Sequence, residues 1–334
     1  MLAIFLQFVL CAAAIVVSGT YLSIYGDVIA EKVGLGRAWI GLILMASVTS
    51  LPELVNGVSS VTVANVPDIA LGDVLGSCVF NIALIALMDL LAGPAPLFSR
   101  ADQGHTLSAG FGIILISIVG VSILAGPVIP SFYGVGFYTP IIILIYFVAI
   151  RSAFLFQKRR IVEFVEEAVV ASRYEDVTLG EAVWKYSISA LVIIVAATLL
   201  PFLAERIAVA TGLGTSFVGT FFVGLTTSLP ELVVSISALR IGAADMAIAN
   251  LFGSNLFNIM VVAVDDIVYR KGPLLLDVST SHTATALMAE IMTGIAVVAL
   301  IFRVQSKTFL RIGWDAVALV VAFCLSMLLL YSMR

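Results

Sequence analysis

Two glutamates lie within long apolar stretches of the sequence, each in a copy of the same short motif. Glu53 belongs to the hexapeptide Thr-Ser-Leu-Pro-Glu-Leu at residues 49–54, and Glu231 belongs to an identical hexapeptide at residues 227–232. A charged residue at bilayer depth costs at least about 2.5–3.5 kcal/mol, so it is a functional candidate by default. We expect the two carboxylates to face each other and to bind a metal cation in transit. The alternative is a pair of structural carboxylates bonded across helices.

Hydroxyl side chains precede each glutamate at helical spacing. Thr49 and Ser50 stand four and three residues before Glu53, so they share its face of a helix. Thr227 and Ser228 have the same relation to the second glutamate. Hydroxyl and carboxylate oxygens are hard ligands, and they suit Ca²⁺, which takes about six to eight oxygens at about 2.3–2.6 Å.

A proline stands directly before each glutamate. Pro52 and Pro230 lack an N–H group and clash with the carbonyl four residues back, so each should kink its helix. The freed carbonyls would be those of Val48 and Thr226. Irregular backbone is tolerated within a membrane where it lines a polar cavity, which fits a site for an ion.

A second polar segment follows each motif. Ser77 and Asn81 share a helix face, as do Ser254 and Asn258. These residues either line the same cavity or serve only in helix packing and interhelical hydrogen bonds. Asp73 lies one turn before Ser77, and it either faces the cavity or lies at headgroup level. The motifs contain no set of His and Cys residues, which argues against zinc or copper.

The composition places these motifs in a membrane. The chain has 334 residues, of which 61% are hydrophobic and 11% are charged, and its mean hydropathy is +1.16. Soluble proteins carry about 25% charged residues, so this chain is an all-α integral membrane protein. A spanning helix needs about 20 apolar residues. Apolar runs predict ten spans, at about 2–25, 38–62, 68–91, 106–126, 134–150, 183–204, 214–239, 245–268, 283–302 and 313–332.

The spans form two halves, and each half contains one copy of the motifs. The predicted organisation is a five-helix repeat at 1–150 with motifs at about 41–82, a cytoplasmic linker loop at 151–182, and a second five-helix repeat at 183–334 with motifs at about 219–259. Equivalent spans are five apart, and five is odd, so the second repeat enters the membrane from the opposite face. Inverted repeats of this kind place equivalent residues around a shared site at the midplane of the membrane.

The repeat extends beyond the motifs. Asp89 and Gly93-Pro94 recur as Asp266 and Gly272-Pro273. Asp89, Asp265 and Asp266 stand near the ends of spans, where we expect them to be charges at the membrane interface.

The distribution of basic residues predicts the orientation of the chain. With the N-terminus outside, thirteen of the seventeen Lys and Arg residues fall in inside loops. Positively charged loops face the cytoplasm, so both termini are predicted to lie outside. The short chain suggests a plasma membrane as its location.

At these motifs the chain resembles the cation/calcium antiporter superfamily, the group of the sodium/calcium exchangers. That group has paired inverted repeats, each with a Gly-Thr-Ser-x-Pro-Glu-like and a Gly-Ser-Asn-x-x-Asn/Asp-like segment. The resemblance implies that Glu53 and Glu231 are the central Ca²⁺ ligands and that the hydroxyl residues line flanking sites for monovalent ions. Family carbonyl ligands map to Ala46 and Gly224.

The sequence departs from the family pattern at several positions, and these leave the counter-ion open. Asn258 stands where sodium/calcium exchangers often have Asp, Asp73 stands where Asn is usual, and Cys78 replaces the Asn of Gly-Ser-Asn. Two ionised glutamates balance one Ca²⁺ or two monovalent ions, and Asp73 could supply the charge for a third. We expect Ca²⁺ efflux in exchange for Na⁺, with H⁺ as the next candidate and K⁺ also open.

Other functions fit less well. A passive cation channel would use the same carboxylates. An intramembrane aspartyl protease is disfavoured because Ala70 replaces the first Gly of a Gly-x-Gly-Asp motif. The chain is thus expected to be a secondary transporter and not an enzyme, with no cofactor beyond the transported ions. Its expected surroundings are the lipid bilayer and cations, without nucleic acid, and a monomer is the working expectation.

Overall fold

The computed structural model describes residues 2–165, 174–211, 226–303, 305–308 and 312–332. Within these ranges the fold is helical, apart from two short antiparallel strands, β1 (Ser131–Phe132) and β2 (Val135–Gly136). Eight helices of the described residues are long and apolar enough to cross a membrane, and a shorter apolar helix covers Trp314–Leu330. The predicted all-α membrane fold is therefore confirmed.

The long helices follow the predicted spans closely. Their bounds are α1 (Leu2–Val33), α5 (Pro67–Leu91), α7 (His105–Ala125), α8 (Tyr138–Val165), α9 (Leu179–Thr211), α12 (Leu229–Arg240), α13 (Ala244–Val268), α14 (His282–Phe302) and α15 (Trp314–Ser332). The beginning of the predicted span at 214–239 lies outside the described residues. Short helical turns are α6 (Leu97–Arg100), η3 (Gly126–Val128) and η5 (Leu274–Leu276).

The predicted second span is built from several segments instead of one regular helix. It comprises α2 (Arg37–Ile40), the π-helical η1 (Gly41–Met45), α3 (Ala46–Thr49), α4 (Leu51–Ser59) and the π-helical η2 (Ser60–Ala64). Close packing requires a glycine at position 41, because a Cβ there would overlap the backbone carbonyl of Met246. Insertions of π-helix often occur at functional sites, which fits the position of this span around Glu53.

Helices overlap both ends of the predicted linker at 151–182. Helix α8 continues to Val165, and α9 already begins at Leu179. The segment from 151 to 165 contains no Gly or Pro, and its Lys, Arg and Glu residues are good helix formers. A helix therefore need not end where its apolar run ends. Residues 166–173 lie outside the described part of the chain.

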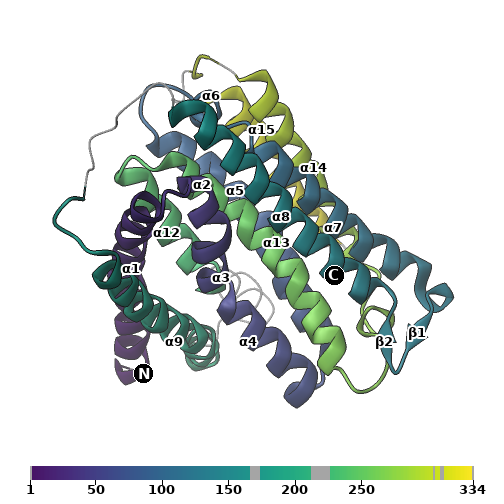
Figure 1. Ribbon diagram of the computed structural model, residues 1–334. Coiled ribbons are helices and arrows are strands. Elements are labelled where there is room, and N and C mark those ends of the chain that lie inside the picture. The colour runs from purple at the N-terminus through teal and green to yellow at the C-terminus, as the bar shows by residue number, and fades with distance from the viewer. Residues whose placement is uncertain (1, 166–173, 212–225, 304, 309–311, 333–334) are drawn as a thin grey trace. The chain divides into compact units, whose positions relative to one another are not determined.

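The chain forms two compact units, each containing parts of both sequence halves. The first unit comprises residues 1–53 and 157–250. In it α1 packs along α9 and also against α12 (Figure 1). Its apolar core includes Ile15, Ala197 and Leu200. Gly19 of α1 lies so close to α12 that a Cβ would approach Val233 Cγ1 to 2.7 Å, as expected where a small residue lets membrane helices meet.

The second unit comprises residues 54–156 and 251–334. Its helices α7 and α14 pack side by side, α14 also packs against α5, and α15 packs against both α5 and α14 (Figure 1). Helix bounds here recur at a constant offset of 177 residues: α5 corresponds to α13, and α7 corresponds to α14, at both ends. This regularity supports the internal repeat predicted from the motifs.

Two buried aspartates in the second unit make equivalent contacts. Asp89 accepts hydrogen bonds from the backbone N–H groups of Leu97 (2.5 Å) and Gly313 (2.7 Å). Asp266 accepts the corresponding bonds from Leu274 (2.7 Å) and Gly136 (2.9 Å). Each equivalent pair is again 177 residues apart, and each aspartate bonds one glycine from the other half of the sequence.

These contacts correct two predictions. Asp89, Asp265 and Asp266 are 2%, 1% and 0% exposed, so they are buried and are not interfacial charges. The prolines that correspond are Pro96 and Pro273, which directly precede the bonded Leu residues; Pro94 is not the partner of Pro273. For Asp89 and Asp266 the physical reason is the loop after each helix, which returns over eight residues to satisfy the carboxylate with backbone N–H groups.

Candidate cation-binding site

The two glutamate motifs share an unusual backbone geometry. The helix is interrupted at Ser50 (φ −97°, ψ 5°) and at the equivalent Ser228 (φ −86°, ψ 5°), and a new helix begins at the next residue. Pro52 and Pro230 are then second residues of helices, where a missing N–H has no consequence. The predicted effect of proline on the helix is confirmed, and it takes the form of a break followed by a restart.

The restart places each glutamate in the first turn of a helix. Glu53 is the third residue of α4, and Glu231 is the third residue of α12. The N-terminal end of a helix carries a partial positive charge, which stabilises a nearby carboxylate in its ionised form. Both side chains are 0% exposed. The local fold thus supports two buried negative charges before any ion is considered.

The two motifs come together within the first unit. The Ser50 hydroxyl donates a hydrogen bond to Glu231 Oε1 over 3.0 Å, although the two residues are 181 positions apart. Helix α3, which ends just before Ser50, packs against α12. The residue three positions before Glu53 therefore touches the other glutamate, as the shared-site prediction requires.

The other predicted ligands of this unit are also buried. Thr49 and Thr227 are 0% exposed. The Ala46 carbonyl accepts bonds from the Ser50 N–H (3.0 Å) and the Thr49 hydroxyl (3.3 Å). Ser228 Oγ is enclosed and has no hydrogen-bond partner in the described part of the chain. The predicted carbonyl ligand Gly224 lies outside the described residues.

The second polar segments meet in the second unit. Asn81 Nδ2 donates to Asn255 Oδ1 (3.0 Å), and Asn255 Nδ2 donates to the Cys78 carbonyl (3.1 Å). Ser77 is 4% exposed and Ser254 is 0% exposed. The segments at 76–81 and 253–258 thus contact each other directly through their asparagines.

Asn255 was not among the predicted site residues. It is the Asn of the Gly-Ser-Asn segment, and its equivalent in the first half is Cys78, 177 residues earlier. The signal in the sequence is the Cys at position 78, where the family pattern has Asn. Only the second half therefore supplies an amide at this position, and that amide bonds the backbone of the first half.

Asn258 is buried in an unusual way. It is 0% exposed, and neither its Oδ1 nor its Nδ2 has a hydrogen-bond partner among the described residues. Asn81 Oδ1 is likewise buried without a hydrogen-bond partner among the described residues. Buried polar atoms are normally hydrogen-bonded, and an exception needs an explanation. An amide oxygen left available in this way is a hard ligand of the kind that Na⁺ and Ca²⁺ take.

Asp73 of α5 contacts helix α4. It is half-buried and accepts a hydrogen bond from Asn56 Nδ2 over 2.7 Å, within the second unit. The described residues contain no group of three or more His, Cys, Asp or Glu residues suited to hold a metal. Within the first unit, a site at the glutamate motifs would therefore combine carboxylates with neutral hydroxyl and carbonyl oxygens.

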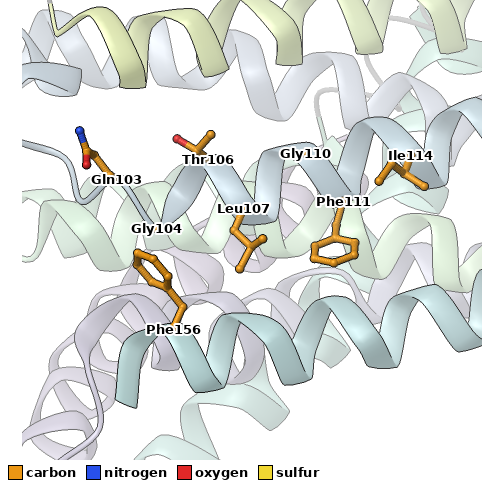
Figure 2. Close-up of a pocket in the computed structure, with 8 residues that line it drawn as sticks. All are labelled: Gln103, Gly104, Thr106, Leu107, Gly110, Phe111, Ile114 and Phe156. Carbon is orange, nitrogen blue, oxygen red and sulfur yellow. The ribbon is translucent and has the colours of Figure 1, made fainter. Parts of the chain in front are cut away.

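A groove in the second unit is formed by residues other than the predicted ligands. It has a volume of about 470 Å³ and is lined by α7 residues such as Leu107, Gly110 and Phe111, together with Phe156 of α8 (Figure 2). None of the predicted ligands lines it, and no carboxylate does. A groove lined mainly by apolar side chains on a membrane helix suits hydrocarbon better than a cation.

Comparison with known proteins agrees with this arrangement. A solved structure of the sodium-calcium exchanger NCX_Mj, soaked with Na⁺ and Sr²⁺, shares the fold with a TM-score of 0.75 at 18% identity, covering 98% of this chain and 99% of that one. The inner membrane protein YrbG of Escherichia coli is 25% identical over 76% of this chain and 78% of its own length. The sodium/calcium exchanger MaX1 of Methanosarcina acetivorans is 31% identical over 36% of this chain and 32% of its own.

The match to the family model covers more of the chain than the match to YrbG or to MaX1. The family model for sodium/calcium exchanger proteins matches residues 3–155 and 182–332, which is most of the chain and includes both copies of each motif. The protein is accordingly a multi-pass membrane transporter of cations, and the chain belongs to the sodium/calcium exchanger family of cation/calcium antiporters.

Proposed function

We propose that this protein exports Ca²⁺ in exchange for Na⁺, with both ions bound at the glutamate motifs. The observation that carries the proposal is the hydrogen bond from Ser50 to Glu231, which joins the two motifs at fully buried carboxylates. NCX_Mj and MaX1 are named as sodium-calcium exchangers, which supports the choice of ions.

The charge of the proposed site sets its ion content. Two ionised glutamates neutralise one Ca²⁺ or two Na⁺, and a third monovalent ion would leave an uncompensated charge in a dry environment, which is unfavourable. Asn258 is neutral where many family members have Asp, so it adds no charge. We propose that Asp73, which accepts a hydrogen bond from Asn56, adds no charge to the glutamate pair. The proposed exchange is therefore one Ca²⁺ for two Na⁺.

The proposed mechanism is alternating access by ten spans in two inverted repeats. The motif segments of spans two, three, seven and eight hold the ions, while α1 and α9, the equivalent first helices of the two halves, slide to open one side at a time. Their packing against each other supports their movement as one body. An empty site with two uncompensated carboxylates resists this movement, and that resistance couples the two ion fluxes.

The proposed location is the plasma membrane with both termini outside. The thirteen basic residues in the loops predicted to be inside support this orientation. YrbG, an inner membrane protein, supports the location.

Uptake of ⁴⁵Ca²⁺ into proteoliposomes tests the proposal. Vesicles loaded with Na⁺ and diluted into Na⁺-free buffer, with pH clamped, should accumulate Ca²⁺ against its gradient. Absence of uptake under these conditions, with uptake on an imposed pH gradient, would replace Na⁺ by H⁺ as the counter-ion. Equilibration without accumulation would indicate a passive channel.

A further inference from the structure

A second pair of carboxylates lies in the unit formed by residues 54–156 and 251–334. Asp73 belongs to α5 and Asp265 to α13. Asp265 is 1% exposed and Asp73 is half-buried. The two groups are close enough for the charge of one to act on the other. Two carboxylates held together in an apolar region repel each other unless a cation or a proton compensates them.

Helix α4 (Leu51–Ser59) brings an amide to the same place. Asn56 donates to Asp73 through its Nδ2 atom, which leaves its own carbonyl oxygen available as a ligand. The next residue, Gly57, faces Asp265, because a Cβ built on it would overlap the Asp265 carboxylate. Asp265 Oδ1 is enclosed and has no hydrogen-bond partner within the described ranges. Residues 56 and 57 of α4 thus lie beside carboxylates of two other helices, and one of these carboxylate oxygens is unsatisfied.

The pair occurs in only one half of the internal repeat. At the offset of 177 residues, the equivalent of Asp73 is Asn250 and the equivalent of Asp265 is Met88. Asn250 donates instead to the Ser235 hydroxyl over 3.1 Å. Asp89 and Asp266, by contrast, recur in both halves. The pair of Asp73 and Asp265 is therefore not imposed by the internal repeat.

We propose that Asp73, Asp265 and the Asn56 carbonyl oxygen form a second binding site for a divalent cation, separate from Glu53 and Glu231. Two carboxylates and an amide are hard oxygen ligands, and their charge of −2 matches one divalent ion. Asp73 lies near the start of α5 and Asp265 near the end of α13, so both lie toward helix ends. The site takes up the ion near one membrane face. Its assignment to Ca²⁺ rests on the proposed function.

Equilibrium binding of ⁴⁵Ca²⁺ to the purified full chain in detergent separates the two sites. The variant E53Q/E231Q removes the glutamate pair, and it should still bind Ca²⁺. Adding D73N/D265N to this variant should remove one equivalent of bound Ca²⁺. The matched control D68N removes an exposed carboxylate of the same helix α5, and it should leave binding unchanged.

The outcomes distinguish the two proposals. Unchanged Ca²⁺ binding after D73N/D265N would overturn the second site. Unchanged binding and transport in E53Q/E231Q would instead refute the glutamate site and leave the aspartate site standing. Size-exclusion chromatography verifies that each variant is folded.

A second variant keeps both charges. G57A should displace the Asp265 carboxylate and weaken Ca²⁺ binding in the E53Q/E231Q background at least several-fold. G112A is its control, because a Cβ on Gly112 of α7 meets nothing within 4 Å. Equal affinities in the two glycine variants would contradict the placement of the cation beside Gly57.

Discussion

Ser50 Oγ and Glu231 Oε1 lie 3.0 Å apart, and this hydrogen bond joins two identical hexapeptides from opposite halves of the chain. Ser50 stands at a break between two helical segments, and Glu231 stands in the first turn after the equivalent break. The contact therefore depends on both interruptions. The same interruptions place both glutamates in the first turn of a helix.

Replacing Glu53 by Gln should abolish Ca²⁺ transport while the protein still folds. The amide keeps the shape of the side chain but removes one of the two charges that balance a divalent ion. The measurement is Na⁺-driven ⁴⁵Ca²⁺ uptake, with thermal unfolding as the check on folding. The control is Glu181→Gln, which changes an exposed glutamate on α9 and should transport normally. Retained exchange in Glu53→Gln would refute its assignment as a ligand.

Replacing Ser50 by Ala should weaken the apparent affinity for Ca²⁺ about tenfold or more. Hydrogen bonds to charged groups contribute about 1.5–3 kcal/mol, and about 1.4 kcal/mol corresponds to a factor of ten. The concentration dependence of uptake gives this affinity. Ser187→Ala is the control, because that hydroxyl lies on an exposed face of α9 and bonds only its own helix backbone. Equal half-saturating Ca²⁺ concentrations in the two variants would argue against a role for Ser50 at the site.

The position of the helix breaks could be predicted from the sequence because proline acts locally. Pro52 alters the backbone within four residues of itself, and Pro230 has the same effect in the second copy of the motif. The contact of Asn255 with Cys78 could not be predicted in this way. It joins residues 177 positions apart, and spacing along one helix carries no information about which residue lies opposite on another.

The buried aspartates illustrate the same limit. Asp89 and Asp266 look like interfacial charges because they stand near the ends of apolar runs. Their burial follows from loops that return eight residues later and from one glycine of the other half. A sequence shows that a carboxylate is present at a span end, but it does not show that backbone N–H groups will surround it.

Replacing Asn255 by Ala should destabilise the protein. The substitution leaves Asn81 Nδ2 without its partner Asn255 Oδ1, at a cost of about 1–3 kcal/mol for a buried group without a bond, and it also removes the bond from Asn255 to the Cys78 carbonyl. The midpoint of thermal unfolding in detergent should fall relative to Gln7→Ala, which removes an exposed amide of α1. The prediction fails if the two variants unfold at the same temperature.

Replacing Arg37 by Ala should also lower stability, through a buried carboxylate. Asp27 is 1% exposed and accepts bonds from Arg37 Nε (2.5 Å), Arg37 Nη2 (3.0 Å) and the Tyr174 hydroxyl (2.9 Å). We expect the free energy of unfolding to fall by about 1–2 kcal/mol. This value is near the lower end for a broken ion pair, because the arginine is 41% exposed. Asp27→Asn in the same chain should recover part of this loss.

A double-mutant cycle with Arg37→Ala and Asp27→Asn measures the coupling between these two side chains by chemical denaturation. Lys185→Ala breaks the exposed pair with Glu181 and should leave stability nearly unchanged. Additive effects of Arg37→Ala and Asp27→Asn would show that the two side chains do not interact in the native protein.

Replacing Asp266 by Asn should lower the unfolding midpoint strongly. This carboxylate accepts four hydrogen bonds, two from backbone N–H groups and two from the hydroxyls of Tyr138 and Thr139, both at 2.5 Å. An amide presents one NH₂ group to these donors, so at least one bond is lost and a donor faces a donor, at a cost of about 1–3 kcal/mol for each unsatisfied group. Asp277→Asn is the control, because Asp277 accepts one side-chain hydrogen bond, from Tyr269, within the described part of the chain. A midpoint for Asp266→Asn equal to that of the control would show that the four bonds do not hold the loop, η5 and the start of α8 together.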